Sequence, residues 1–449
     1  MIGTIHSIAN RPIVYLKGKL PPSQFFVLSA ILVGLTSGLA AVSLKYLVHS
    51  IERLITYYSE IFDEFLVFAL FPLIGILLTV VYIRYFLRAE IKKGTADIVH
   101  AIIKKSSKIP ATTMYSHLIT SGLTVGFGGS MGLESPMVST GSAIGSNYGS
   151  TYQLSYKDRT ILLACGAAAG IGAAFNSPIA GVLFAVEVLL TDVSAAALIP
   201  LIISAACGAL LSKIILQEDA LLSFSLQQPF NYHNVPYYIV LGVLAGFMSL
   251  YYVRVFTWVD LRMKSVANMW VRVLLGGFML FVLLIFFPPL FGEGYESIKT
   301  LSLLQPSQLT KVSVVKGFVD NDVHLLIFLG AMMFVKTIAA AITTGSGGNG
   351  GSFAPSLFVG AYLGFVFARF VNLTGMARVP ESNFTLVAMA GILSGVFYAP
   401  LTAIFLIAEI TGGYELMIPL MIVSALSVTV AKFFEPLSME GKKLSHMLN

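Results

Sequence analysis

The stretch GFGGSMGLESP at residues 126–136 is repeated as GSGGNGGSFAP at residues 345–355. The two stretches share four glycines and their final proline, at an offset of 219 residues (Pro136 to Pro355). Each stretch runs into an apolar segment, so each predicts a glycine-rich turn followed by a helix that begins near the proline. A match of this kind, about half the chain apart, predicts two related halves.

A second repeated block lies downstream of each turn. Residues 175–178 (FNSP) and Glu187 match residues 397–400 (FYAP) and Glu409, at an offset of 222 residues (Glu187 to Glu409). Two pairs of glycines between the blocks keep the first offset of 219, namely Gly141 with Gly360 and Gly145 with Gly364. Because the blocks recur in one order and at nearly one offset, we interpret the chain as an internal repeat.

The composition places both halves in a lipid bilayer. Of the 449 residues, 56% are hydrophobic and only 11% are charged, whereas a soluble domain carries about 25% charged residues. Mean hydropathy is +0.84. This balance excludes a disordered protein, a coiled coil and an ordinary soluble enzyme, and it predicts an all-α polytopic membrane protein. Residues 25–48 and 65–86 are each long enough to cross a bilayer.

The charged residues indicate topology and not nucleic-acid binding. Basic residues gather near the N-terminus, at residues 84–108 and in the C-terminal tail, and the positive-inside rule places all three in the cytoplasm. Cys165 and Cys207 lie in apolar runs and are predicted to be buried hydrophobes. The seven histidines lack ligand spacing. We therefore predict no metal site, no cofactor and no enzymatic activity.

The repeat and the hydropathy together predict five regions. They are a cytoplasmic segment at residues 1–23, a first membrane repeat at 24–216, a linker at 217–234, a second membrane repeat at 235–435 and a short cytoplasmic tail at 436–449. No appended soluble domain is expected after the second repeat. The compact length predicts a multi-pass protein of a prokaryotic inner membrane.

Both repeats contain helices that are predicted to be shorter than a full span. Residues 120–191 and 343–411 are apolar but are interrupted by glycine, serine and proline. Broken helices are tolerated in a bilayer only where they are buried in protein or line a cavity. At matching places in two halves they indicate a transport site near the midplane, in either an inverted or a parallel repeat.

The glycine-rich turns have the chemistry of an anion site. Glycine lets backbone amides approach a ligand closely, and a helix N-terminus presents unpaired N–H groups with about half a positive charge. Two such ends, one from each repeat, are predicted to meet and to bind an anion without a full positive charge. Close helix packing through small residues is the alternative explanation for the glycines.

Glu134 lies inside the first glycine-rich turn, where the anion would bind. A carboxylate at this depth is costly and therefore predicts a function. We expect the ionised side chain to occupy the anion site and the protonated side chain to leave it, which would make Glu134 a gate. The alternative is a carboxylate that only stabilises its own helix. Glu187 and Glu409 are predicted to be structural, with a functional role as their alternative.

These motifs resemble those of the CLC family of chloride channels and proton-coupled chloride antiporters. Residues 132–136 (GLESP) resemble its GxExP signature, and residues 350–355 (GGSFAP) resemble its GxFxP signature. The resemblance implies an inverted repeat of tilted and half-length helices, and a homodimer with one anion pathway per subunit. It implies an interface near residues 180–215 and 400–430. It implies Glu134 as the gating glutamate, and anion binding at Gly132, Leu133, Ser352, Phe353 and Ala354.

Three positions depart from the family pattern. Residues 92–98 keep only Gly94 of the GSGIP signature, and Lys93 falls where the central serine would be. No tyrosine follows Tyr414, so the central tyrosine is missing. Val188 stands where antiporters commonly carry an inner proton-transferring glutamate, and valine cannot carry a proton. Lys93 is predicted to bind the anion at the inner mouth, and its alternative is a lysine that snorkels at the membrane interface.

The leading functional prediction is a passive chloride channel gated by protonation of Glu134. Its expected partners are chloride, the lipid bilayer and a second copy of the chain. The alternative is a proton-coupled chloride antiporter whose inner proton route passes Val188. Fluoride export ranks lower, because the family's fluoride branch carries different residues in the first signature. An intramembrane serine hydrolase is a further alternative, since residues 128–132 match GxSxG, but only His117 lies nearby as a base. A cation symporter is another, but helix N-termini with few fixed acids favour anions.

Overall fold

The computed structural model describes residues 13, 15–62, 65–88, 94–190, 195–217, 229–310, 319 and 321–448. The helices of the first half are α2 (Pro22–Phe62), α3 (Phe65–Val81), α4 (Thr95–Lys104), α5 (Thr113–Gly126), α6 (Glu134–Thr151), α7 (Tyr156–Phe175), α8 (Pro178–Phe184) and α9 (Ala195–Leu216). Those of the second half are α10 (Val235–Lys264), α11 (Met269–Phe286), α12 (Tyr295–Ser302), α13 (Asp322–Gly345), α14 (Phe353–Leu373), α15 (Glu381–Phe397), α16 (Pro400–Ile410), α17 (Met417–Phe434) and α18 (Met439–Leu448).

Short helical turns complete this architecture. Two are π-helical, Tyr82–Leu87 and Ala185–Leu189, and three are 3-10 turns, Tyr232–Asn234, Pro288–Leu290 and Pro306–Thr310. In the described part of the chain, extended pairing is limited to one bridge between Gly132 and Gly351. The protein is therefore helical apart from its connections.

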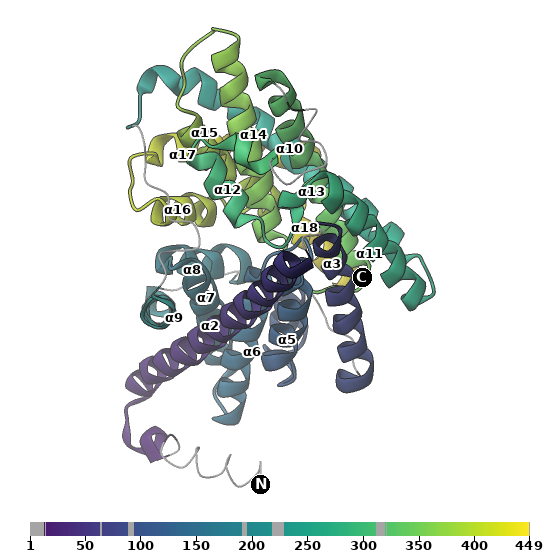
Figure 1. The fold of residues 1–449 in the computed structure, drawn as a ribbon. Coiled ribbons are helices and arrows are strands. Elements are labelled where there is room, and N and C mark those ends of the chain that lie inside the picture. Colours follow the sequence, from purple (N-terminus) through teal and green to yellow (C-terminus); the bar gives the residue numbers. More distant parts are fainter. Residues whose placement is uncertain are drawn as a thin grey trace.

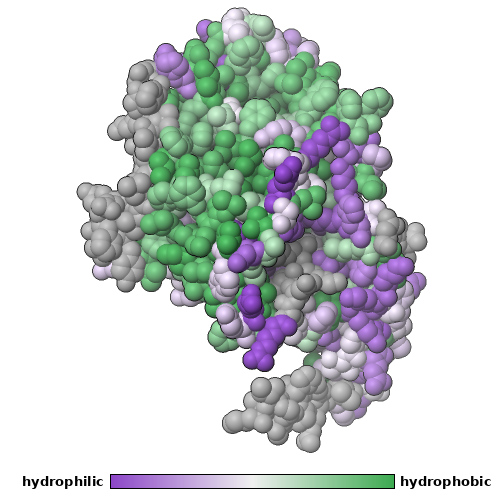
Figure 2. All heavy atoms as spheres, turned by 90° about the vertical axis from the view of Figure 1, so that its right-hand side faces the viewer, coloured by the Kyte–Doolittle hydropathy of each residue, from purple (hydrophilic) through white to green (hydrophobic). Residues whose placement is uncertain are grey.

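The helices suit a lipid bilayer. Within the described ranges, nine helical segments are long and apolar enough to cross a membrane. They include the two spans expected near the N-terminus, which the structure places at Pro22–Tyr57 and Phe68–Leu87. Figure 2 shows a broad hydrophobic face with hydrophilic residues gathered along one side of it. Shorter apolar helices occur at Pro178–Leu189, Glu381–Phe397 and Pro400–Ile410, which confirms the predicted polytopic fold with half-length helices.

The two halves of the chain form two groups of helices. Figure 1 shows α2 and α5 to α9 in its lower part, and α10, α12 and α14 to α17 in its upper part. Equivalent helices pair in the same way, because α6 packs on α7 and α14 packs on α15. Helix α3 lies beside α11 of the second half. The boundaries of the five regions stay a prediction, and residues 1–12 and 218–228 lie outside the described residues.

Glycines that match at the offset of 219 lie where the paired helices touch. A Cβ atom added at Gly141 would lie 2.1 Å from the carbonyl oxygen of Gly166 on α7. One added at Gly364 would lie 2.1 Å from the carbonyl oxygen of Phe384 on α15. No side chain fits at such a distance, so close helix packing explains these glycines.

Glu187 and Glu409 cap helices reciprocally across the two halves. Glu187 accepts hydrogen bonds from the amides of Leu401 and Thr402, in the first turn of α16, at 2.9 and 2.7 Å. Glu409 accepts bonds from the first turn of α8 at 3.1 and 2.9 Å. Because a carboxylate at a helix N-terminus satisfies unpaired amides and opposes the helix dipole, these contacts support the predicted structural role.

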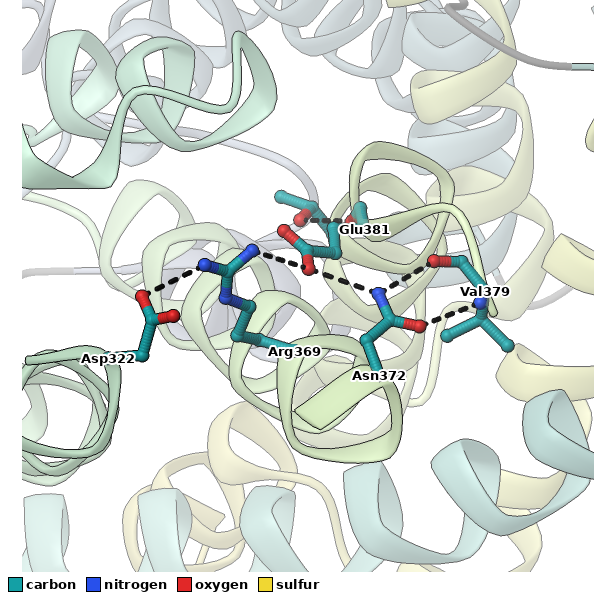
Figure 3. Close-up of polar contacts among 6 residues, drawn as sticks. Asp322, Arg369, Asn372, Val379 and Glu381 are labelled. Carbon is teal, nitrogen blue, oxygen red and sulfur yellow. Dashed lines mark hydrogen bonds and ion pairs between the residues drawn. The ribbon is translucent and has the colours of Figure 1, made fainter. Parts of the chain in front are cut away.

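A polar network fixes the turn between α14 and α15 (Figure 3). Arg369 donates to Asp322 at the start of α13 at 2.9 Å and to Glu381 at the start of α15 at 3.2 Å. Asn372 donates to Glu381 at 3.0 Å and also exchanges two hydrogen bonds with the backbone of Val379. The network therefore ties α14 to its neighbours at the end opposite its N-terminus, which forms part of the site.

Candidate functional site

The two glycine-rich turns meet directly. The Gly132 amide donates to the Gly351 carbonyl at 2.9 Å, and the Gly351 amide donates to the Gly132 carbonyl at 2.7 Å. The matched residues Gly128 and Gly347 have φ angles of +90° and +115°, a region that favours glycine. The turns therefore face each other in antiparallel fashion and bring the N-termini of α6 and α14 together.

A second reciprocal pair of hydrogen bonds, from backbone amides to threonine hydroxyls, links the two turns to the opposite halves. The Ser130 amide donates to the Thr343 hydroxyl at 3.2 Å, and the Asn349 amide donates to the Thr124 hydroxyl at 2.9 Å. Both donors and both acceptors are related by the offset of 219 residues. The contacts therefore surround a local pseudo-twofold axis, which passes between the two turns.

The Glu134 side chain lies between the two helix N-termini. Glu134 begins α6 and is 1% exposed, and its Oε1 accepts a hydrogen bond from the Tyr295 hydroxyl. Its Oε2 is buried and has no hydrogen-bond partner among the described residues. A Cβ atom added at Gly132 would lie 2.2 Å from this Oε2 and 3.1 Å from the Ala354 amide nitrogen. The gating role of Glu134 stays a prediction.

A small cavity continues from Glu134 toward α4 and α18. Its volume of about 20 Å³ suffices for one water-sized particle. The lining residues come from both halves and are Thr95, Glu134, Ser135, Val138, Ile171, Phe184, Ser352, Phe353, Phe397 and Glu440. Of the residues predicted to bind the anion, Ser352 and Phe353 line this cavity, whereas Gly132, Leu133 and Ala354 lie in the turns and first helical residues beside it.

Glu293 occupies one of the amides that were predicted to bind the anion. It lies between α11 and α12, and its Oε1 accepts a hydrogen bond from the Leu133 amide at 3.0 Å. Burial, and then the charges of Glu134 and Glu52, raise the pKa of Glu293 well above its usual range. Glu293 therefore binds a proton more readily than an exposed glutamate does.

Lys336 supports the loop that carries Glu293 and leads into α12, which begins at Tyr295. It is fully buried in α13, and its ammonium donates to the carbonyls of Leu290 and Gly292 at 3.3 and 2.9 Å. The sequence analysis did not select these three residues. A lysine inside an apolar helix was the available signal, because intramembrane charges are rare and functional by default.

The three departures from the family pattern have different outcomes in the structure. Lys93 lies outside the described residues, so its role stays a prediction. Val188 is half-buried in the π-helical turn after α8. In the C-terminal region without a tyrosine, the first turn of α18 instead places Glu440 in the cavity wall, opposite the α6 turn.

The residues of the GxSxG match are engaged elsewhere. The Ser130 hydroxyl donates to the carbonyl of Leu290 at 2.7 Å. The Nδ1 atom of the His117 ring lies 3.2 Å from the side-chain amide nitrogen of Asn349. A hydrolase would need the serine hydroxyl hydrogen-bonded to the histidine, and these contacts direct the two side chains to different partners.

Comparisons with known proteins agree on one family. The family model described as voltage gated chloride channel matches residues 74–432. A putative chloride channel protein, ClcB-like, of Ralstonia nicotianae is 30% identical over 363 residues, which cover 79% of this chain and 80% of the relative. Chloride channel protein CLC-e of Arabidopsis thaliana is 30% identical, over 89% of this chain and 59% of the relative. The voltage-gated ClC-type chloride channel ClcB of Escherichia coli is 28% identical and covers 70% and 71%.

Solved structures share the fold. A slow cyanobacterial Cl⁻/H⁺ antiporter matches with a TM-score of 0.81 at 23% identity, over 96% of this chain and 99% of the other. A CLC-type fluoride/proton antiporter matches with a TM-score of 0.74 at 22% identity, over 93% and 97%. The predicted fold class, a CLC-like arrangement of tilted and half-length helices, is confirmed.

Proposed function

Because the chain belongs to the voltage-gated chloride channel (CLC) family, we propose that it exchanges chloride for protons across a membrane, with Glu134 as the gate. The observation that carries this proposal is the position of the Glu134 carboxylate between the N-termini of α6 and α14. A carboxylate there competes with chloride for the same amides, and it also accepts a proton. One group that takes part in both steps couples the movements of the two ions.

The closed form of the site fits exchange, and the similar structures favour exchange over passive conduction. Glu134 is 1% exposed, and the cavity below it holds about one water-sized particle. An exchanger requires an occluded site that opens to one side at a time, and a channel gated by Glu134 would be closed in the same form. The two structures with TM-scores of 0.81 and 0.74 are described as antiporters. Exchange therefore takes the place of the channel as the favoured function.

A passive, proton-gated chloride channel is the second candidate. Val188 is the observation that favours it, because the side chain cannot carry a proton at the position of the family's inner glutamate. The Ralstonia, Arabidopsis and Escherichia coli relatives are also named as chloride channels. In both candidates the backbone at Ser352, Phe353 and Ala354 holds the anion, and Lys93 attracts it. The Leu133 amide joins them once Glu293 leaves it, and Gly132, whose amide bonds to the Gly351 carbonyl, shapes the turn beside the anion.

Ion movements in liposomes test the proposal. Vesicles that contain the purified protein are loaded with chloride, diluted into low-chloride medium and voltage-clamped with a potassium ionophore. Exchange predicts that protons enter as chloride leaves, so the external pH rises and a pH gradient displaces the reversal potential. Chloride efflux with no proton uptake, and a reversal potential set by chloride alone, would identify a channel.

We also propose that the protein works as a homodimer. Helix α8 packs against α9 and α16, and α16 packs against α17. On α9, α16 and α17 the exposed large apolar side chains include Ile199, Ile202, Leu210, Ile214, Leu401, Ile418 and Met421. These residues lie in the ranges 180–215 and 400–430, where the family resemblance implies an interface.

The bacterial relatives support the predicted location in a prokaryotic inner membrane, and a plant relative matches as well.

A further inference from the structure

The geometry points to Glu440 as a second carboxylate gate at the other end of the same cavity. We propose that its side chain holds the anion position at the N-terminus of α4 and gives it up to chloride. The inference rests on the proposed anion transport, but it does not require proton exchange. It gives a function to the region where this chain lacks the family's central tyrosine.

The Glu440 carboxylate is seated on the first turn of α4. Its Oε2 accepts a hydrogen bond from the Ala96 amide at 2.9 Å. A Cβ atom added at Gly94, which has a φ angle of +103°, would lie 2.9 Å from the same oxygen. The unpaired amides of a helix N-terminus attract anions. Glu440 therefore occupies the place at α4 that a free anion would take.

The same cavity contains a second carboxylate that lacks a full set of partners. Glu134 and Glu440 both line it, with Thr95, Ser352 and Phe353 between them. Oε2 of Glu134 is buried without a hydrogen-bond partner in the described part of the chain. The cavity is thus lined by the first residues of α4 and of α6, and the carboxylates of Glu440 and Glu134 both border it. The arrangement suits an anion that displaces first one carboxylate and then the other.

Three charged groups surround Glu440 among the described residues. They are Lys443 on α18, which contacts Oε1 at 2.9 Å, Asp97 on α4 and Asp260 on α10, which is itself paired with Lys264 at 2.6 Å. The remaining helix in contact with α18 is α15, and its only charged residue, Glu381, lies at the far end beside Arg369. The Glu440 side chain is 13% exposed. Lys443 and the α4 amides thus hold the carboxylate as a charged group.

A tethered carboxylate competes with chloride because its local concentration is high. Neutralising the carboxylate removes the competitor, so chloride affinity increases. A proton that binds Glu440 from the cytoplasmic side has the same effect, and chloride affinity therefore rises as the pH falls. Glu440 also supplies a proton acceptor on the side where Val188 supplies none.

Calorimetric titration of the full-length protein with potassium chloride tests the inference at neutral pH. Glu440→Gln keeps the shape of the side chain and removes its charge. The expected result is chloride binding that is tighter by at least about fivefold, the lower end of the range for coupled sites. Unchanged affinity in a folded Glu440→Gln protein would overturn the proposal.

Two control variants separate the gate from other effects of charge. Glu440→Gln also leaves Lys443 without its carboxylate, and a lone ammonium would itself attract chloride. The double variant Glu440→Gln/Lys443→Met should keep the gain in affinity. Loss of the gain would assign it to Lys443 and reject the gate. Glu435→Gln neutralises a nearby carboxylate that pairs with Arg254 and Lys442, and it should leave chloride affinity unchanged.

A measurement without any substitution of Glu440 covers the case in which Glu440→Gln does not fold. In Glu134→Gln/Glu293→Gln protein, which lacks both carboxylates of the first glycine-rich turn, chloride affinity should still rise as the pH falls, because Glu440 still titrates. A flat pH profile would overturn the inference. These titrations use no ion gradient, so they are independent of exchange. If Glu440→Gln binds chloride more tightly but liposomes show no proton uptake, chloride–proton exchange is rejected. The proposal that Glu440 is a second carboxylate gate then still stands.

Discussion

Two carboxylates, the buried Glu134 and the half-buried Glu187, differ in how many hydrogen bonds hold them. Oε2 of Glu187 accepts bonds from the Thr402 amide and hydroxyl, and Oε1 accepts one from the Leu401 amide. Oε1 of Glu134 accepts a hydrogen bond from the Tyr295 hydroxyl, and Oε2 lacks a partner among the described residues. Because hydrogen bonds to a charged group are strong, Glu187 is anchored and Glu134 is displaceable.

Glu134→Gln should abolish proton movement coupled to chloride while chloride movement continues. The amide cannot take up a proton, and it no longer competes as an anion for the amides of α6 and α14. Proton and chloride fluxes from the same liposomes check this expectation. Glu296→Gln, an exposed carboxylate in the first turn of α12, is the control and should keep both fluxes. A variant that moves neither ion, although folded, would contradict the gate.

Tyr295→Phe removes the donor that holds Oε1 of Glu134. A hydrogen bond to a charged group contributes about 1.5–3 kcal/mol, so the carboxylate should compete less well and chloride should bind about tenfold more tightly. Calorimetry measures the change. Tyr251→Phe deletes a hydroxyl that donates to the Phe334 carbonyl away from the site, and its chloride affinity should match that of the unchanged protein. Equal affinities for both variants would contradict the role of Tyr295.

At the scale of elements, the short helices α8 and α16 depend on each other. Each has its first turn capped by a carboxylate that belongs to the other half of the chain. A short helix satisfies few of its own amides, so an outside acceptor matters more to it than to a long helix. The two half-length helices are thereby joined as one unit near the proposed dimer surface.

Glu409→Gln should lower stability by about 1 kcal/mol, because it replaces a charged cap on α8 with a neutral one. The thermal unfolding midpoint in detergent measures the effect. Glu415→Gln changes an exposed carboxylate a few residues away and should leave the midpoint unchanged. Chloride transport by the folded Glu409→Gln protein should persist, and a selective loss of proton coupling would assign this residue a transport role instead.

For the whole molecule, the sequence predicted the features that the repeated motifs determine, but it missed contacts between residues that are distant in the chain. Glycines, prolines and the pair Glu187 and Glu409 recur at fixed offsets, and Glu134 lies inside one of the repeated turns. The helical membrane fold, the paired turns and the position of the site could therefore be predicted. Glu293 and Tyr295, at the start of α12, reach the first turn from 160 and 161 residues further along the chain. Glu440 reaches α4 from the other end of the sequence. Such contacts depend on tertiary folding, which residue spacing does not encode.

The proposed dimer predicts that substitutions of two exposed apolar residues will affect the oligomeric state differently. Ile202 on α9 is 54% exposed within the proposed interface, and Leu274 on α11 is 59% exposed outside it. Ile202→Trp should shift the protein toward monomers, because a larger side chain disturbs a packed interface. Leu274→Trp should not. Light scattering coupled to size-exclusion chromatography distinguishes them, and equal masses for both variants would reject this surface.

The reciprocal bonds between the two glycine-rich turns also set an order for biosynthesis. The amides of Gly132 and Ser130 find their acceptors at Gly351 and Thr343, which leave the ribosome only after most of the chain has been made. Until then the first half carries polar groups that no partner satisfies. The ion site should therefore be among the last parts to form, and a chain truncated before residue 351 should insert its helices without gaining the ability to bind chloride.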